Sequence, residues 1–139
     1  MTTPFPEITD AQELIMRELW KQSPLSAQDI AARLAPRTAW KLTTVKTLLT
    51  RLHAKGAITA TQRGKANDYA PAVSEDAWIR VESRSFLDRV FNGAMTPMLA
   101  HLFEDRRVSR ADLKALRALL EEAERNIPPR PRSRKEPRP

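Results

Sequence analysis

The sequence predicts a mainly helical fold. The expected fold consists of an N-terminal winged helix-turn-helix made of three helices and a β-hairpin wing, a C-terminal helical dimerisation domain, and a disordered Pro/Arg tail. Apolar residues recur at three- and four-residue spacings through most of the chain, as in amphipathic helices. Residues 58–71 instead show the β-branched content and alternation of a hairpin. Residues 33–69 carry eight basic side chains and one acidic one, a charge excess that indicates an anionic partner.

Three consecutive helices are expected in the first domain, residues 1–72. Thr9 with Gln12, and Ser26 with Asp29, each form a capping-box pattern, so helices should begin there and run to about residues 21 and 34. A third helix is expected over 43–55, closed by Gly56 as a left-handed cap. The expected inward faces are Ala11, Leu14, Ile15 and Leu19 in the first helix, and Ala27, Ile30, Ala31 and Leu34 in the second.

The third helix has two contrasting faces. At 100° per residue, one sector holds its apolar residues, namely Val45, Leu48, Leu49 and Leu52. The opposite sector has no acid and no bulky apolar group, only short hydroxyls and cations. Threonine is a poor helix former on an exposed face, so chance is a weak explanation, and hydroxyls and cations suit base edges and phosphates. We therefore expect this helix to enter the DNA groove.

After the third helix, residues 58–63 and 68–71 should form the two strands of a wing around a turn at 64–67. Arg63 and Lys65 lie near its tip. The full set of expected DNA-binding residues is Lys41, Thr43, Thr44, Lys46, Thr47, Arg51, Arg63 and Lys65.

Residues 73–126 are expected to form a helical dimerisation domain. Apolar residues continue at helical spacing from Leu87 to Leu102, interrupted at Asn92-Gly93 and Pro97, and a last helix should begin at the capping box of Ser109. That last helix repeats apolar residues every three and four positions, as does one wall of a helical dimer. Packing within the chain would explain the same pattern. The expected dimerisation residues are Leu87, Val90, Phe91, Met95, Leu99, Leu113, Leu116 and Leu120.

Composition excludes most catalytic classes. The chain of 139 residues contains no cysteine, two histidines and three glycines, so thiolate chemistry, Cys-based metal sites and phosphate-cradling glycine loops are ruled out. Neither His53 nor His101 has a carboxylate partner at useful spacing, which argues against a nuclease or hydrolase. We expect no enzyme activity, no metal and no cofactor.

No apolar run reaches the length of a membrane span, and residues 1–9 lack the features of a signal peptide. We therefore expect a cytoplasmic protein with no lipid partner. The tail, 127–139, carries five prolines and five basic residues and should not fold.

Several segments together resemble the penicillinase-repressor (BlaI/MecI/CopY-type) transcriptional regulators. The resemblance covers about residues 7–125 and is carried by residues 44–56 (TVKTLLTRLHAKG) and by Tyr69-Ala70-Pro71. It implies a homodimeric winged-helix repressor that occupies dyad operators in double-stranded DNA. Its half-sites would lie about one helical turn, roughly 34 Å, apart.

In β-lactam-responsive members, which serve an antibiotic response, a membrane sensor metalloprotease triggers cleavage at an Asn-Phe bond, and the aligned pair here is His101-Leu102. Copper-responsive members carry C-terminal cysteine motifs, which this chain lacks. A protein-interaction adaptor built on a winged-helix scaffold, without specific DNA binding, is the alternative function.

Overall fold

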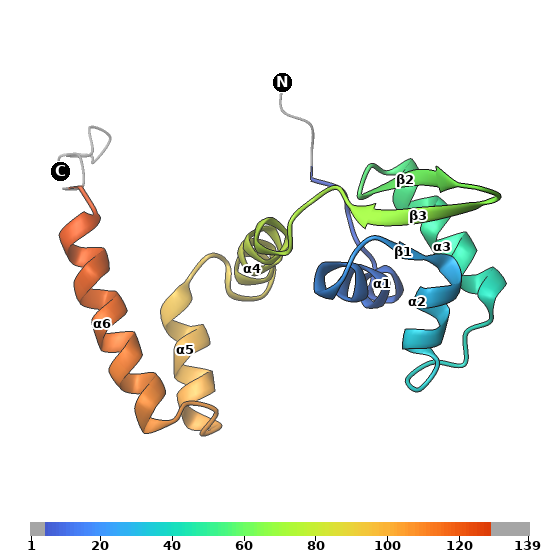
Figure 1. Ribbon diagram of the computed structural model, residues 1–139. Coiled ribbons are helices and arrows are strands. Elements are labelled where there is room, and N and C mark those ends of the chain that lie inside the picture. The colour runs from blue at the N-terminus through green and yellow to red at the C-terminus, as the bar shows by residue number, and fades with distance from the viewer. Residues whose placement is uncertain (1–4, 129–139) are drawn as a thin grey trace. The chain divides into compact units, whose positions relative to one another are not determined.

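The computed structural model describes residues 5–128, and within this range it contains six helices and one three-stranded sheet. The chain divides into two compact units, Met1–Phe86 and Leu87–Pro139, and Figure 1 labels their helices and strands. The mainly helical, winged-helix prediction is confirmed. Most of the expected disordered tail lies outside the described residues.

The three N-terminal helices follow their local sequence signals. Helices α1 (Asp10–Lys21) and α2 (Ala27–Leu34) begin at complete capping boxes formed by Thr9 and Ser26, as predicted. Helix α3 (Leu42–Ala54) begins one residue earlier than expected and has no side-chain cap. It ends before Gly56, whose φ of +81° suits a residue without a Cβ.

The sheet has strand order β1-β3-β2 and is antiparallel throughout. Strands β2 (Ile58–Arg63) and β3 (Ala66–Pro71) form the predicted wing. The expected turn of residues 64–67 is too long, because Arg63 pairs with Ala66 and leaves two residues in the turn. Two-residue turns favour positive φ, and Gly64 has a φ of +62°. The sequence did not predict β1 (Leu25–Ser26), where Leu25 pairs with Tyr69.

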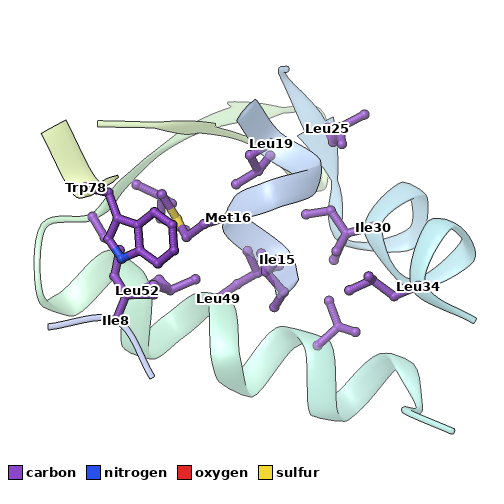
Figure 2. Packing of buried hydrophobic residues seen from close by; sticks show 14 residues of the cluster. Ile8, Ile15, Met16, Leu19, Leu25, Ile30, Leu34, Leu49, Leu52 and Trp78 are labelled. Carbon is purple, nitrogen blue, oxygen red and sulfur yellow. The ribbon is translucent and has the colours of Figure 1, made fainter. Parts of the chain in front are cut away.

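One hydrophobic core holds the first unit together (Figure 2). Ile15 and Met16 of α1, Ile30 of α2, and Leu49 and Leu52 of α3 are fully buried in it. The sequence predicted most of these residues but missed Met16, and the expected core positions Ala11, Leu14, Ala31 and Leu48 are only partly buried. Because α3 packs against α1 and α2 through this one stripe, its remaining surface faces outward.

Helix α4 (Glu75–Phe91) begins in the first unit and is fastened to α1 there. Trp78 is buried and its ring lies 5.4 Å from that of Trp20. Arg17 stacks over the Trp78 ring at 4.7 Å and forms an ion pair with Glu75 at 2.9 Å. These contacts fix the first turns of α4 against α1 within the first unit.

The second unit continues with α5 (Met95–Glu104) and α6 (Arg110–Asn126), the latter beginning at the predicted capping box of Ser109. The break between α4 and α5 falls at Asn92 and Gly93, which have φ values of +52° and +82°. Pro97 does not interrupt the chain as expected. It occupies the first turn of α5, where backbone N–H groups have no carbonyl partner within the helix, so the N–H that proline lacks breaks no hydrogen bond. None of the helices described has the length and apolar character needed to span a lipid bilayer.

Candidate nucleic-acid interface

The outer face of α3 combines small hydroxyls with long cations. Because Val45, Leu49 and Leu52 are buried, the side chains on the opposite side are turned to solvent. The exposed residues are Thr43, Thr44, Lys46, Thr47, Thr50 and Arg51. This face contains no acidic residue, so it presents only positive charge, hydroxyls and methyl groups.

Two of these threonines bond back to their own helix. The Thr47 Oγ1 donates to the Thr43 carbonyl at 3.0 Å, and the Thr50 Oγ1 donates to the Lys46 carbonyl at 2.9 Å. Such back-bonding supplies a partner for the hydroxyl proton. It leaves the oxygen lone pairs free to accept a hydrogen bond. Both residues are exposed, and a threonine methyl group suits the thymine methyl in the major groove.

Several cations of the basic segment are occupied within the fold. Glu18 of α1 is buried, and its carboxylate accepts from Arg33 at 3.4 Å, from Arg37 at 3.0 Å and from Lys21 at 3.3 Å. Lys55 donates to the Gln12 side chain at 2.9 Å. Arg33, Arg37 and Lys55 therefore tie helices together rather than extend the charged face.

Arg63 on the wing is also paired. Its Nε and Nη2 donate to the two carboxylate oxygens of Asp68, at 2.8 and 3.0 Å. These hydrogen bonds, with the attraction between the charges, raise the pKa of Arg63 and hold the pKa of Asp68 below its ordinary value. The guanidinium thus lies across the hairpin in a fixed orientation while its outer surface stays exposed.

Four cations of this segment remain without a partner among the described residues: Lys41, Lys46, Arg51 and Lys65. All four are exposed, at the start of α3, along it and at the tip of the wing. An open groove connects these elements and is lined by Lys46, Thr50, Arg63 and Lys65, together with Ser26 and Gln28 from the start of α2. Of the predicted residues, the groove brings together Lys46 of α3 with Arg63 and Lys65 of the wing. The others line no part of the groove but are exposed on α3 or at its start: Lys41, Thr43, Thr44, Thr47 and Arg51.

The expected dimerisation residues all lie on the helices of the second unit, and none of them is buried. Val90, Met95, Leu113 and Leu120 are 38–63 % exposed, and Leu87, Phe91, Leu99 and Leu116 are half-buried. The pair aligned with the family's cleavage bond, His101 and Leu102, is exposed within α5, with the His101 ring 5.9 Å from that of Phe91. No cluster of potential metal ligands occurs among residues 5–128.

Sequence reasoning missed Glu18 and Gln12, the buried polar residues that hold cations in place. A signal was present, because Glu18 follows Ile15 by three positions and Gln12 precedes it by three. Both therefore share the buried side of α1. An acid at such a position needs cationic partners, and the basic segment provides them.

Comparisons with known proteins show the family to which the chain is related. The family model described as penicillinase repressor matches residues 8–122. The penicillinase repressor of Bacillus licheniformis is 32 % identical over 84 % of this chain and 91 % of its own. The methicillin resistance regulatory protein MecI of Staphylococcus aureus (strain N315) is 27 % identical over 82 % of this chain and 93 % of its own.

A solution structure of the DNA-binding domain of the repressor BlaI aligns with a TM-score of 0.48 and 30 % identity, over 53 % of this chain and 90 % of that one. The family match spans both the winged-helix unit and most of the helices that follow it. The chain belongs to the penicillinase repressor family of DNA-binding transcriptional repressors.

Proposed function

We propose that two copies of this chain bind a DNA site with two-fold symmetry, each placing α3 in a major groove. The acid-free outer face of α3, with its unpaired cations, carries the proposal. A helix of this kind reads base edges with the side chains that face the groove, while flanking cations contact phosphates. Repression then follows from occupying the site and requires no chemistry.

Each predicted residue has a role in this arrangement. Arg51 projects from the exposed side of α3 and is the candidate for a bidentate contact to guanine, with Thr43, Thr44 and Thr47 beside it. Lys41, Lys46 and Lys65 would neutralise phosphates. Arg63 would lie beside the DNA backbone at the wing, but its pair with Asp68 offsets its charge, so it would neutralise no phosphate of its own.

The helices of the second unit would join the two copies. In a single chain no described residue after Trp78 is buried, so the apolar residues from Leu87 to Leu120 have little to pack against. Exposed apolar surface of this extent is typical of an interface. A dimer would double the phosphate contacts and fix the spacing of the two recognition helices.

Release of the operator would follow loss of the dimer. Cleavage between His101 and Leu102 would separate α6 from the rest of the chain, and both residues are exposed. By analogy with the family, the protease would be controlled by a membrane sensor metalloprotease. The protein would act in the bacterial cytoplasm, where its DNA target lies.

Fluorescence anisotropy tests the DNA-binding part directly. The full chain is titrated into labelled DNA from upstream of its own gene and into a scrambled duplex, at several salt concentrations. We expect a preference of about 10³-fold or more at physiological salt, which Arg51→Ala reduces. Arg84→Ala is the matched control, because Arg84 is an exposed helical arginine outside this face. Absence of binding to any DNA would overturn the proposal and favour a protein adaptor.

A further inference from the structure

Helix α6 is mostly basic in its first half and mostly acidic in its second half. Arg110, Lys114 and Arg117 occupy its first half, and Glu121, Glu122 and Glu124 occupy its second half. The helix macrodipole favours the opposite arrangement, with acids near the N-terminus and bases near the C-terminus. Asp112 and Arg125 follow the favourable order, but they are outnumbered in their respective halves.

Ion pairs within α6 do not link its basic half to its acidic half. Arg117 and Glu121 are four residues apart in the cation-first order, which is the weaker one, and they form no ion pair in the structure. The pairs found in the described part of α6 are both local to its last turn: Glu122 with Arg125 at 2.8 Å, and Glu122 with Asn126 at 3.2 Å. The cations of the first half have no acidic partner there.

These charges border an unpartnered apolar seam. Leu113, Leu116, Leu120 and Ala123 form the seam, and none of them is buried. Leu113 shares one open hollow with Arg110, Lys114 and Arg117, so the basic residues lie beside the seam. At 100° per residue, Glu121 and Glu124 fall on the same side of it.

The seam is also symmetric along the helix. Leu113 and Ala123 lie five residues on either side of Ala118, and Leu116 and Leu120 lie two residues on either side. The charges change sign about this centre, because Arg110 and Lys114 precede it by eight and four residues, and Glu124 and Glu121 follow it by six and three. A helix of this design matches a second copy of itself running in the opposite direction.

We propose that α6 packs antiparallel against α6 of a second copy, centred near Ala118. The inference rests on the homodimer proposed above and specifies which helix pairs and in which direction. The apolar seams then meet, and the basic half of each helix lies against the acidic half of the other. A parallel pair would put the charged sides of the two helices on opposite flanks of the seam and basic halves at the same level, so the basic half of one helix would not meet the acidic half of the other. The reversed charge order is thus explained as a device that sets the direction of pairing.

Spin-label distances measure the direction. The chain has no cysteine, so Ala111→Cys and Ala118→Cys each introduce a unique labelling site on the face away from the seam. In an antiparallel pair the two labels at 111 are offset along the axis by about 21 Å, at about 1.5 Å per residue, whereas the labels at 118 lie opposite each other. The distance at 118 should therefore be clearly shorter than that at 111. Equal distances, or a shorter one at 111, would overturn the antiparallel pair.

Charge reversal tests the cause. Sedimentation should show that the dimer dissociation constant rises about tenfold or more in two variants. These are Lys114→Glu/Arg117→Glu and Glu121→Lys/Glu122→Lys. An equimolar mixture should restore association by forming a heterodimer. Lys41→Glu/Lys65→Glu changes the net charge by the same amount as Lys114→Glu/Arg117→Glu, but outside α6, and should leave the dimer intact.

The outcomes separate the two proposals. A wild-type chain that stays monomeric at all concentrations would overturn the homodimer itself. A stable dimer that ignores charge reversal on α6, or whose mixed variants fail to associate, would overturn the α6 pairing alone.

Discussion

The salt dependence of operator binding should report how many cations the fold leaves free. The sequence offers eight basic residues between positions 33 and 69, but Arg33, Arg37, Lys55 and Arg63 are paired within the chain. Four unpaired cations per chain give at most eight phosphate contacts in a dimer. Each contact contributes about −0.9 to the slope of log K against log salt concentration.

The expected slope is therefore about −7, and affinity should fall about 2 × 10⁴-fold between about 50 and about 200 mM salt. If all eight basic residues of each chain contacted phosphates, the slope would be about −14. The assay is fluorescence anisotropy on a symmetric operator. It should use a chain that ends at Pro128, because the five basic residues beyond that point would add contacts of their own.

Lys65→Ala provides an internal calibration. It removes one cation per chain, so the slope should become shallower by about 2 in a dimer. Arg33→Ala should leave the slope unchanged, because Arg33 is held by Glu18. A slope steeper than about −10, or an equal change with both variants, would refute the idea that ion pairs inside the fold withdraw half of the positive charge.

Further predictions concern specificity and stability. Arg51→Ala should weaken operator binding by about 1–3 kcal/mol and scrambled DNA much less; equal losses in anisotropy titrations would argue against base contact. Glu18→Gln should lower the free energy of unfolding by about 1–3 kcal/mol, as measured by urea unfolding followed by tryptophan fluorescence. This is less than the usual cost of breaking a buried ion pair, because the arginines that Glu18 binds are partly exposed to water. Gly56→Ala should cost about 1–2 kcal/mol in the same assay, because an L-residue is strained at φ +81°. The pKa of Asp68 is lowered in the folded state. Its carboxylate should therefore stabilise the fold at pH values above the ordinary pKa of aspartate, and this stabilisation should disappear as the pH falls through the lowered pKa. If the difference in free energy of unfolding between the wild type and Asp68→Asn did not change with pH, this prediction would be wrong.

Features encoded by a few neighbouring residues were predictable. The capping boxes of Thr9, Ser26 and Ser109 all occur where the sequence placed them, because each depends on two side chains three residues apart. The exposed face of α3 was likewise predictable, since a helical period fixes what lies opposite a buried stripe. Within a single helix, the order of the residues alone thus determines where the helix begins and which side chains are exposed.

Features that depend on distant partners were not predictable. Strand β1 has two residues, and it exists because Leu25 and Ser26 pair with β3, more than forty residues further along the chain. The ion pairs inside the fold have the same cause. Nothing near Arg37 in sequence indicates that it reaches Glu18 of α1, so the count of basic residues alone did not separate paired from unpaired cations.

This distinction bears on how the surface achieves selectivity. A repressor must bind one site among a large excess of other DNA, and each additional phosphate contact strengthens correct and incorrect binding alike. Pairing Arg33 and Arg37 with Glu18, and Arg63 with Asp68, reduces this unspecific attraction while stabilising the helices and the wing. The charge that remains is concentrated on α3 and the tip of the wing, beside the side chains that face the bases. On this view the internal ion pairs raise the ratio of specific to unspecific affinity, and Glu18→Gln should lower that ratio even in preparations that remain fully folded.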